Sequence, residues 1–184
     1  MTTAGNSIEA MAASACAIVV MGVSGTGKTT LSQRLGTTLG CPVLEGDDYH
    51  SAANVAKMQT GHPLTDEDRW PWLDRLGAAI GTTARERGIA VAACSALRRA
   101  YRERLSRAAG VPLFFLLLDT GAEQIARRMR GRSGHYMPPS LLDSQLATLE
   151  RPGADECALT LDAGRSPDLL VAEALAWIEG KRNG

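Results

Sequence analysis

The chain has 184 residues, 45% of them hydrophobic and 22% charged, which is typical of a soluble globular protein and unlike a disordered chain. Its 20 basic and 20 acidic residues cancel, so no excess of positive charge indicates a nucleic-acid or membrane partner. The length fits one domain. We expect a flexible N-terminal tail at residues 1–14 and a single domain at residues 15–184.

The four cysteines, Cys16, Cys41, Cys94 and Cys157, form no CxxC pair and have no histidine at metal-ligand spacing. Reduced thiols in a cytosolic protein therefore fit better than zinc or a disulfide framework. The first apolar run, at residues 15–21, is too short to span a membrane, and no basic segment of a signal peptide precedes it. These features predict a cytoplasmic protein.

Short apolar runs alternate with longer amphipathic segments, a pattern that indicates a parallel sheet wrapped by helices. Strands are expected at residues 16–21, 42–44, 89–94, 112–118 and 157–161. Helices are expected at residues 29–39, 70–87, 98–108, 121–130, 138–149 and 167–178. The fold class predicted from this order is a three-layer α/β domain with five strands.

Residues 22–29, GVSGTGKT, match the phosphate-loop pattern G-x-x-x-x-G-K-[ST] between an expected strand and helix. The glycines allow tight turns that point backbone N–H groups inward, and the helix adds the positive end of its dipole. Lys28 would face the β- and γ-phosphates, and the Thr29 hydroxyl would be a ligand of Mg²⁺. The predicted ATP-binding residues are Gly22, Val23, Ser24, Gly25, Thr26, Gly27, Lys28, Thr29 and Thr30. The alternative, a glycine-rich turn with an exposed lysine, is disfavoured by the flanking strand and helix.

The phosphate loop alone does not name the reaction, because switches, motors and small-molecule kinases share it. No Asn-Lys-x-Asp tetrad for reading guanine is present, which weighs against a GTPase switch. A single domain without an oligomerisation segment weighs against a ring ATPase. A second site, for a phosphoryl acceptor, would distinguish a kinase from a nucleotide-binding module.

Four further blocks are distinctive: GDDYH at residues 46–50, PLTDEDRWPWL at 63–73, CSALRRAYR at 94–102 and PGADE at 152–156. In this order and spacing they resemble the gluconokinase family, ATP:D-gluconate 6-phosphotransferases, over about residues 17–178. The resemblance implies a fold like that of nucleoside-monophosphate kinases, a sheet of five parallel strands, a mobile lid at about residues 128–139 and a homodimer. It also implies Mg²⁺-dependent phosphorylation of D-gluconate to 6-phospho-D-gluconate, which feeds the pentose phosphate pathway.

On the acceptor side, Asp47 follows a strand at the edge of the sheet where ligands collect. Its carboxylate could orient the sugar-acid hydroxyl, accept its proton, or hold Mg²⁺ through water. Asp47 is preferred to Asp48 because the resemblance places an acid there more firmly. The alternative is that this pair of acids caps the next helix.

The substrate implied by the resemblance carries one carboxylate and five hydroxyls. Arg69 and Arg98 are candidates for the carboxylate, because a guanidinium group matches it with two hydrogen bonds. His50 and Ser95 are candidate partners of the hydroxyls, although His50 could equally be a structural hydrogen-bonding residue. Tyr101 and the neighbouring arginine at position 102 are assigned to helix packing.

Arg128 and Arg132 flank a glycine-rich segment that could close over the site. Closure would bring positive charge to the transferring phosphoryl group and exclude water. The predicted catalytic residues are therefore Lys28, Asp47, Arg128 and Arg132. Asp119 ends an apolar run that imitates a Walker B strand, but we leave it out of the metal site. Two alternatives stay open: another small-molecule kinase of the same fold, and a regulatory nucleotide-binding module without catalysis.

Overall fold

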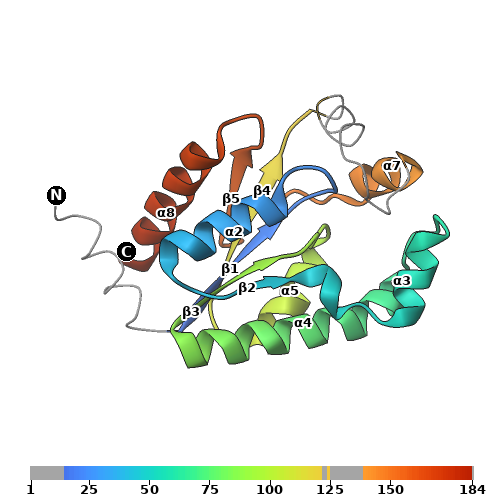
Figure 1. Cartoon of the computed structure of the whole chain (residues 1–184), viewed down its shortest axis with the longest axis horizontal. Helices are drawn as coiled ribbons and strands as arrows, with labels where there is room; N and C mark the ends of the chain where they lie inside the picture. The colour runs from blue at the N-terminus through green and yellow to red at the C-terminus, as the bar shows by residue number, and fades with distance from the viewer. Residues whose placement is uncertain (1–14, 122–123, 125–138, 184) are drawn as a thin grey trace.

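The computed structural model describes residues 15–121, 124 and 139–183, and these form one three-layer α/β unit (Figure 1). Several predictions concern segments outside this range. They are the tail at residues 1–14, most of the helix expected at 121–130, nearly all of the lid at 128–139, and the two lid arginines.

A five-stranded sheet forms the middle layer, with the strand order β2-β3-β1-β4-β5. All neighbouring strands are parallel, which confirms the predicted sheet. The strands are β1 (Cys16–Met21), β2 (Val43–Glu45), β3 (Ile89–Ala93), β4 (Leu113–Asp119) and β5 (Ala158–Asp162). Each begins and ends within one residue of its predicted limits.

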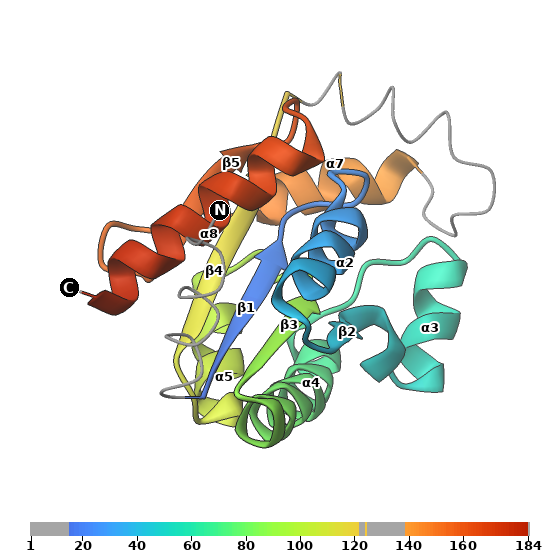
Figure 2. The same ribbon diagram turned by 60° about the vertical axis from the view of Figure 1, so that its left-hand side comes forward.

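Helices cover both faces of the sheet, with α2 and α8 on one side and α4 and α5 on the other (Figures 1 and 2). The helices are α2 (Lys28–Leu39), η1, a short 3₁₀ helix (Gly46–Tyr49), α3 (Ala52–Gln59), α4 (Asp66–Arg87), α5 (Arg99–Ala109), α7 (Pro139–Thr148) and α8 (Pro167–Asn183). Alternate residues of β1 enter the two cores: Val19 packs with α4 and α5, while Ile18 packs with α2 and α8. No helix in the described ranges is long and apolar enough to cross a membrane.

Several helical features differ from the prediction, among them α8, which ends at Asn183, five residues beyond the expected end at 178. Helix α4 begins at Asp66, four residues before the expected start, because Thr65 and Asp68 form a reciprocal capping box. Helix α3, which follows the cap residue Ser51, was not predicted. Its one buried residue is the polar Asn54, so it lacks the apolar periodicity by which a helix is recognised in sequence.

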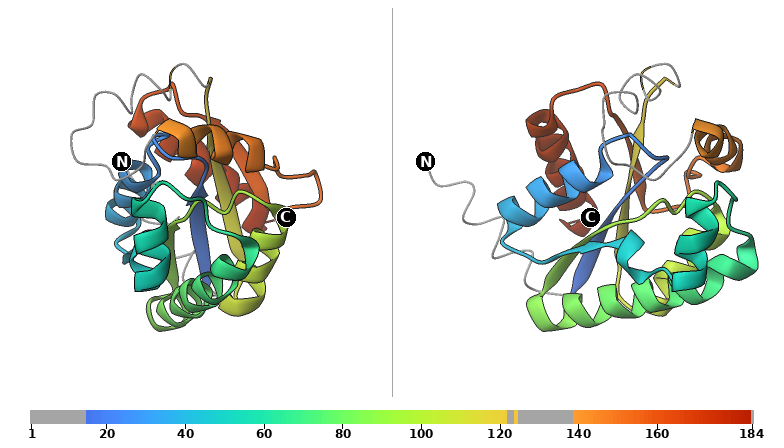
Figure 3. Two further views of the ribbon diagram at one scale, coloured as in Figure 1. Left: turned by 90° about the vertical axis from the view of Figure 1, so that its right-hand side faces the viewer. Right: turned by 45° about the vertical axis from the view of Figure 1, so that its right-hand side comes forward.

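The ends of three strands bring the predicted motifs together. The phosphate loop follows β1, the GDDYH block follows β2, and Ser95 follows β3. The backbone N–H of Gly22 donates to the carbonyl of Ser95 over 3.2 Å, which ties two of these segments directly. Helices α3 and α7 also lie at this end of the sheet (Figure 3). In parallel α/β sheets this edge is the usual place for a ligand.

Candidate active site

The phosphate loop is held open by its glycines and braced by its own side chains. Gly22 has a φ of +135°, and a Cβ there would lie 2.6 Å from the carbonyl oxygen of Leu118, so only glycine fits. The buried Thr26 hydroxyl donates to the carbonyl of Val23 over 2.9 Å, and the Lys28 ammonium donates to the same carbonyl over 3.1 Å. The glycines and side chains of the loop itself therefore set its shape.

Thr29, the predicted Mg²⁺ ligand, has an acidic neighbour that sequence analysis missed. Its hydroxyl donates to Oε2 of Glu45 over 2.9 Å. Burial raises the pKa of Glu45, and the hydrogen bond from Thr29 opposes this shift. The signal in the sequence was an acid at the end of β2, the strand that leads into GDDYH.

This oxygen pair fits Mg²⁺, which prefers hard oxygen ligands and usually keeps several waters and substrate phosphates in its shell. Thr29 would bind the ion directly, and Glu45 could bind it directly or through water. In the described segments no three His, Cys, Asp or Glu side chains gather into a metal site made by protein alone.

Trp72 fixes the backbone that carries the acceptor residues. Its indole Nε1 donates to the carbonyl of Gly46 over 2.7 Å, and its side chain is fully buried. Gly46 packs so closely on the end of β3 that a Cβ would lie 2.5 Å from the carbonyl oxygen of Ala93. The block at residues 63–73, which contains Trp72, therefore helps to position the GDDYH block.

His50 is buried and neutral beside an exposed carboxylate. Its side chain is 4% exposed, that of Asp47 is 83% exposed, and His50 Nε2 lies 3.9 Å from Asp47 Oδ1. Burial lowers the pKa of His50 to about 4, and Asp47 opposes this shift in part. His50 Nδ1 is buried and has no hydrogen-bond partner among the described residues. A neutral imidazole can both donate and accept a hydrogen bond, as a hydroxyl ligand requires.

One cavity joins the phosphate loop to the predicted acceptor residues. It holds about 660 Å³ of space not filled by protein atoms, including open solvent at its mouth. The predicted residues on its wall are Ser24, Lys28, Asp47, His50, Arg69 and Ser95. Helix α7 adds three polar residues to which the sequence analysis assigns no role: Ser144, Gln145 and Thr148.

The two candidate carboxylate anchors both lie near the ring of Tyr101, but they differ in their partners and in whether they line the cavity. Arg98 lies outside the cavity lining, and its Nη1 donates to both oxygens of Asp66 over 3.1 and 3.3 Å. Arg69 lines the cavity and donates to the neutral carbonyl of Leu64 over 3.3 and 3.4 Å. Within the described chain Arg69 has no acidic partner. The structure thus brings Arg69, and not Arg98, to the acceptor residues.

The residues assigned to other roles do not line the cavity. Asp119 forms an ion pair with Arg151 over 2.7 Å at the end of β4. Tyr101 and Arg102 are buried on α5, as expected for packing residues. Nothing is described for Arg128 and Arg132, whose roles stay predictions.

Comparisons with known proteins identify the family of this chain. A family model described as an AAA domain matches residues 18–152. A gluconokinase from Gluconobacter oxydans (strain 621H) is 48% identical over 164 residues, 89% of this chain and 92% of that protein. A solved gluconokinase from Sinorhizobium meliloti 1021 is 42% identical, has a TM-score of 0.80 and covers 92% of this chain and 94% of its own. An unliganded sugar kinase from Janibacter sp. HTCC2649 is 46% identical, with a TM-score of 0.83 and coverage of 89% and 94%. The chain therefore belongs to the AAA-domain family of P-loop proteins and, within it, to the gluconokinases.

Proposed function

We propose that this enzyme transfers the γ-phosphoryl group of ATP to the 6-hydroxyl of D-gluconate, giving ADP and 6-phospho-D-gluconate. The observation that carries the proposal is the shared cavity, where the phosphate-loop lysine Lys28 and the acceptor residues Asp47 and Arg69 line one space. The gluconokinase relatives support the choice of acceptor.

On the donor side, the N–H groups of the phosphate loop and Lys28 bind the phosphates of ATP. Thr29, with Glu45, would hold Mg²⁺, which neutralises charge on the β- and γ-phosphate oxygens. Arg128 and Arg132 are proposed to add positive charge to the transferring group. The loop acts by orientation and fixed dipoles, since phosphoryl transfer needs little covalent chemistry from the protein.

On the acceptor side, Asp47 takes the proton of the 6-hydroxyl. The oxygen of that hydroxyl forms a bond to the γ-phosphorus, while the bond from the γ-phosphorus to the β-γ bridging oxygen breaks and ADP leaves. Arg69 holds the carboxylate at the other end of the six-carbon chain. His50 and Ser95 bind hydroxyls between these ends. Because His50 is neutral, it can serve the polyol without adding a second cation beside Arg69.

The finer aspects of this proposal are dependence on Mg²⁺, location in the cytoplasm and assembly as a homodimer. Each rests on the family and on the sequence features above. Omission of Mg²⁺ from the assay, and the mass of the protein in solution by light scattering, test the first and the last.

The direct test is coupled ADP release with Mg-ATP and D-gluconate, compared with shikimate, AMP and no acceptor. Among these acceptors, we expect only gluconate to support ADP release. The product should show the phosphorus resonance of a 6-phosphate ester. ADP release with shikimate or AMP would show that the proposed acceptor is wrong, although the protein would still be a small-molecule kinase of this fold. ATP binding without any acceptor-dependent rate would overturn the kinase and favour a regulatory module.

A further inference from the structure

Helix α7 presents an apolar face to the protein and a polar face to the cavity. Leu142, Leu146 and Leu149 pack on Val23 of the phosphate loop and on Leu97, which follows β3. One or two residues away along the helix, Ser144, Gln145 and Thr148 line the acceptor cavity. The spacing of four between Ser144 and Thr148 places both on one side of the helix. None of these three residues was assigned a role by the sequence motifs.

Gln145 lies where the two substrate sites meet. The backbone N–H of Ser24, in the phosphate loop, donates to Gln145 Oε1 over 2.7 Å across 121 residues of sequence. Both residues line the cavity. The loop binds phosphate through its backbone N–H groups, so a ligand in the loop and the Gln145 side chain compete for the same kind of donor. Gln145 therefore contacts the phosphate loop and the acceptor cavity at the same time.

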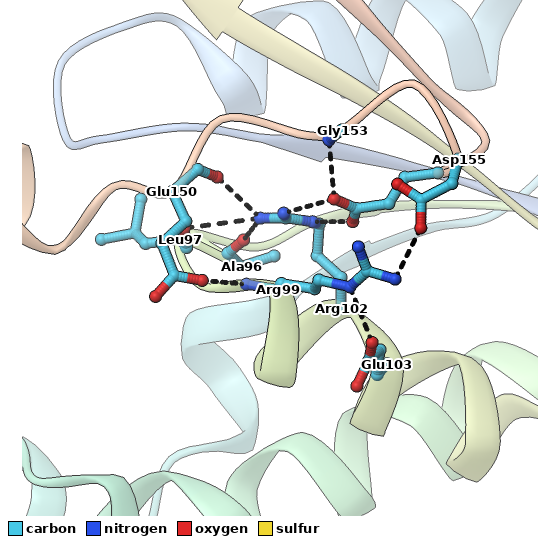
Figure 4. A network of polar contacts seen from close by, with 9 residues as sticks. Ala96, Leu97, Arg99, Arg102, Glu103, Glu150, Gly153 and Asp155 are labelled. Atoms are coloured by element: carbon cyan, nitrogen blue, oxygen red, sulfur yellow. Dashed lines mark hydrogen bonds and ion pairs between the residues drawn. The ribbon is translucent and has the colours of Figure 1, made fainter.

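The far end of α7 is fixed by a buried polar network (Figure 4). The N–H of Glu150, two residues after the end of the helix, donates to the carbonyl of Leu97 over 2.8 Å. The Arg102 guanidinium donates to the carbonyl of Glu150 over 3.1 Å and pairs with both carboxylate oxygens of Glu156 over 2.5 and 2.9 Å. Arg102 is 1% exposed. Because this end of α7 is anchored, the polar face of the helix is held in place along the wall of the cavity.

The chemistry of the polar face suits an acyclic polyol. Each hydroxyl of such a ligand both donates and accepts, and Ser, Gln and Thr side chains can do the same. The Thr148 hydroxyl donates to the carbonyl of Ser144 over 2.7 Å, so its oxygen presents lone pairs to a ligand hydroxyl. These side chains add no charge beside Arg69, which leaves the carboxylate end of the ligand to the guanidinium.

We propose that Ser144, Gln145 and Thr148 form the hydroxyl-binding wall of the acceptor site, and that Gln145 couples this wall to the phosphate loop through Ser24. This inference rests on the proposed gluconokinase function and adds the part of the site that reads the polyol. Because the same side chain touches both sites, the affinity for gluconate changes when a nucleotide fills the loop, and the affinity for the nucleotide changes by the same factor.

The test uses the full chain with the variants Gln145→Ala and Thr148→Val, and with Gln33→Ala as a matched control on the exposed surface of α2. Steady-state KM values are measured for gluconate and for ATP, with 2-, 3- and 4-deoxy-D-gluconate as acceptors that each lack one hydroxyl. Gluconate binding is measured by calorimetry with and without Mg-ADP. The thermal midpoint of each variant checks that it is folded.

We expect Gln145→Ala and Thr148→Val to raise the KM for gluconate by about 3- to 10-fold, the loss of one hydrogen bond. Each should lose the preference of the wild type for gluconate over at least one deoxy analogue. In Gln145→Ala, the effect of Mg-ADP on gluconate affinity should shrink toward none. Gln33→Ala should match the wild type in every measurement.

An active wild type whose preference and nucleotide effect survive in both variants would overturn this inference while leaving the proposed function in place. An increase confined to the KM for ATP would also overturn it, because Gln145 would then belong to the donor site alone. A wild type without gluconate-dependent ADP release would instead overturn the proposed function, and the inference with it.

Discussion

The imidazole of His50 stacks on the indole of Trp72, with ring centroids 4.1 Å apart and ring planes 20° apart. The same indole donates from Nε1 to the carbonyl of Gly46, four residues before His50. One buried side chain of α4 thus holds both ends of the segment that carries Asp47. The acceptor residues are set by the hydrophobic core and not by the loop alone.

Replacing Trp72 with phenylalanine should therefore damage the site as well as the fold. Trp72→Phe keeps an aromatic ring but leaves the buried carbonyl of Gly46 without its donor, a cost of about 1–3 kcal/mol in the free energy of unfolding. The KM for gluconate should rise because Asp47 and His50 lose their support. Urea unfolding and steady-state kinetics measure the two effects. Trp70→Phe, on the same helix but only half-buried, is the control and should change both far less.

The buried His50 should make stability depend on pH. Its pKa is about 4 in the folded protein against 6.5 for the free side chain, so between these values the unfolded chain binds more protons. The stability that the protein gains from keeping His50 neutral is fully present above pH 6.5 and is lost as the pH falls toward 4. Its size is up to about 3 kcal/mol. Urea unfolding at pH 7 and pH 4.5 measures it in the wild type and in His50→Gln.

We expect His50→Gln to lose less stability on acidification than the wild type does. A nuclear magnetic resonance titration of the His50 ring should give a midpoint near 4, because burial lowers this pKa. His62→Gln, at an exposed position, should retain the pH dependence of the wild type. A midpoint near 6.5 would show that His50 is hydrated, and would contradict its description as a neutral partner of hydroxyls.

Two arginines of α5 offer a matched pair for stability. Arg102 is buried and paired with Glu156, whereas Arg104 pairs with Asp74 at the surface, where the two side chains are 34% and 47% exposed. Arg102→Met leaves the Glu156 carboxylate unpaired and should cost about 3–5 kcal/mol in the free energy of unfolding. Arg104→Met should cost at most about 1 kcal/mol.

Urea unfolding distinguishes these two arginines, and the double variant Arg102→Met with Glu156→Leu should recover part of the loss, because no buried charge then stays unpaired. Equal costs for Arg102→Met and Arg104→Met would mean that the network of Figure 4 does not anchor the segment after α7.

The carboxylate of gluconate should depend on Arg69 more than on Arg98. Arg69→Ala removes the guanidinium group from the acceptor side of the cavity, and the KM for gluconate should rise by about 10- to 100-fold, the loss of a charge-assisted hydrogen bond. Arg98→Ala breaks a partly exposed pair with Asp66 and should raise it less than about 5-fold. Saturation curves for gluconate at fixed Mg-ATP measure both. A larger increase in KM for Arg98→Ala than for Arg69→Ala would mean that Arg98 binds the carboxylate and that Arg69 packs against Tyr101.

The sheet and the phosphate loop could be predicted because their signals are local. Every residue of β1 is buried, so the strand is a continuous apolar run, and the glycine pattern of the loop reflects backbone angles that glycine adopts most readily. Helix α3 could not be predicted, because it packs on little apolar surface. Ser51 caps its first turn instead, and the hydrogen bond from the Asn54 side chain to the carbonyl of Asp68 ties it to the start of α4.

The acceptor site could be predicted only in part, because its remaining members depend on distant contacts. Arg69 and Arg98 are chemically alike in sequence, and the difference between them is that Asp66 folds back onto Arg98. Gln145 lies 121 residues from the backbone group it contacts in the phosphate loop. Glu45 is identified as a site residue by the hydrogen bond that its carboxylate accepts from the Thr29 hydroxyl, a contact that requires the folded structure.

Asp47 lines the cavity shared with the phosphate loop, where we propose that it faces the reacting hydroxyl. The most direct test of this role compares kcat for gluconate phosphorylation in Asp47→Asn and in Asp48→Asn, two adjacent exposed acids of which Asp47 alone lines the cavity. We predict that Asp47→Asn lowers kcat by at least about 100-fold, the contribution of a general base, with ATP binding retained. Asp48→Asn should keep kcat within about threefold of the wild type, given the typical cost of an exposed charge. A kcat that survives Asp47→Asn, or that falls only in Asp48→Asn, would contradict the assignment of Asp47 as the residue that accepts the proton.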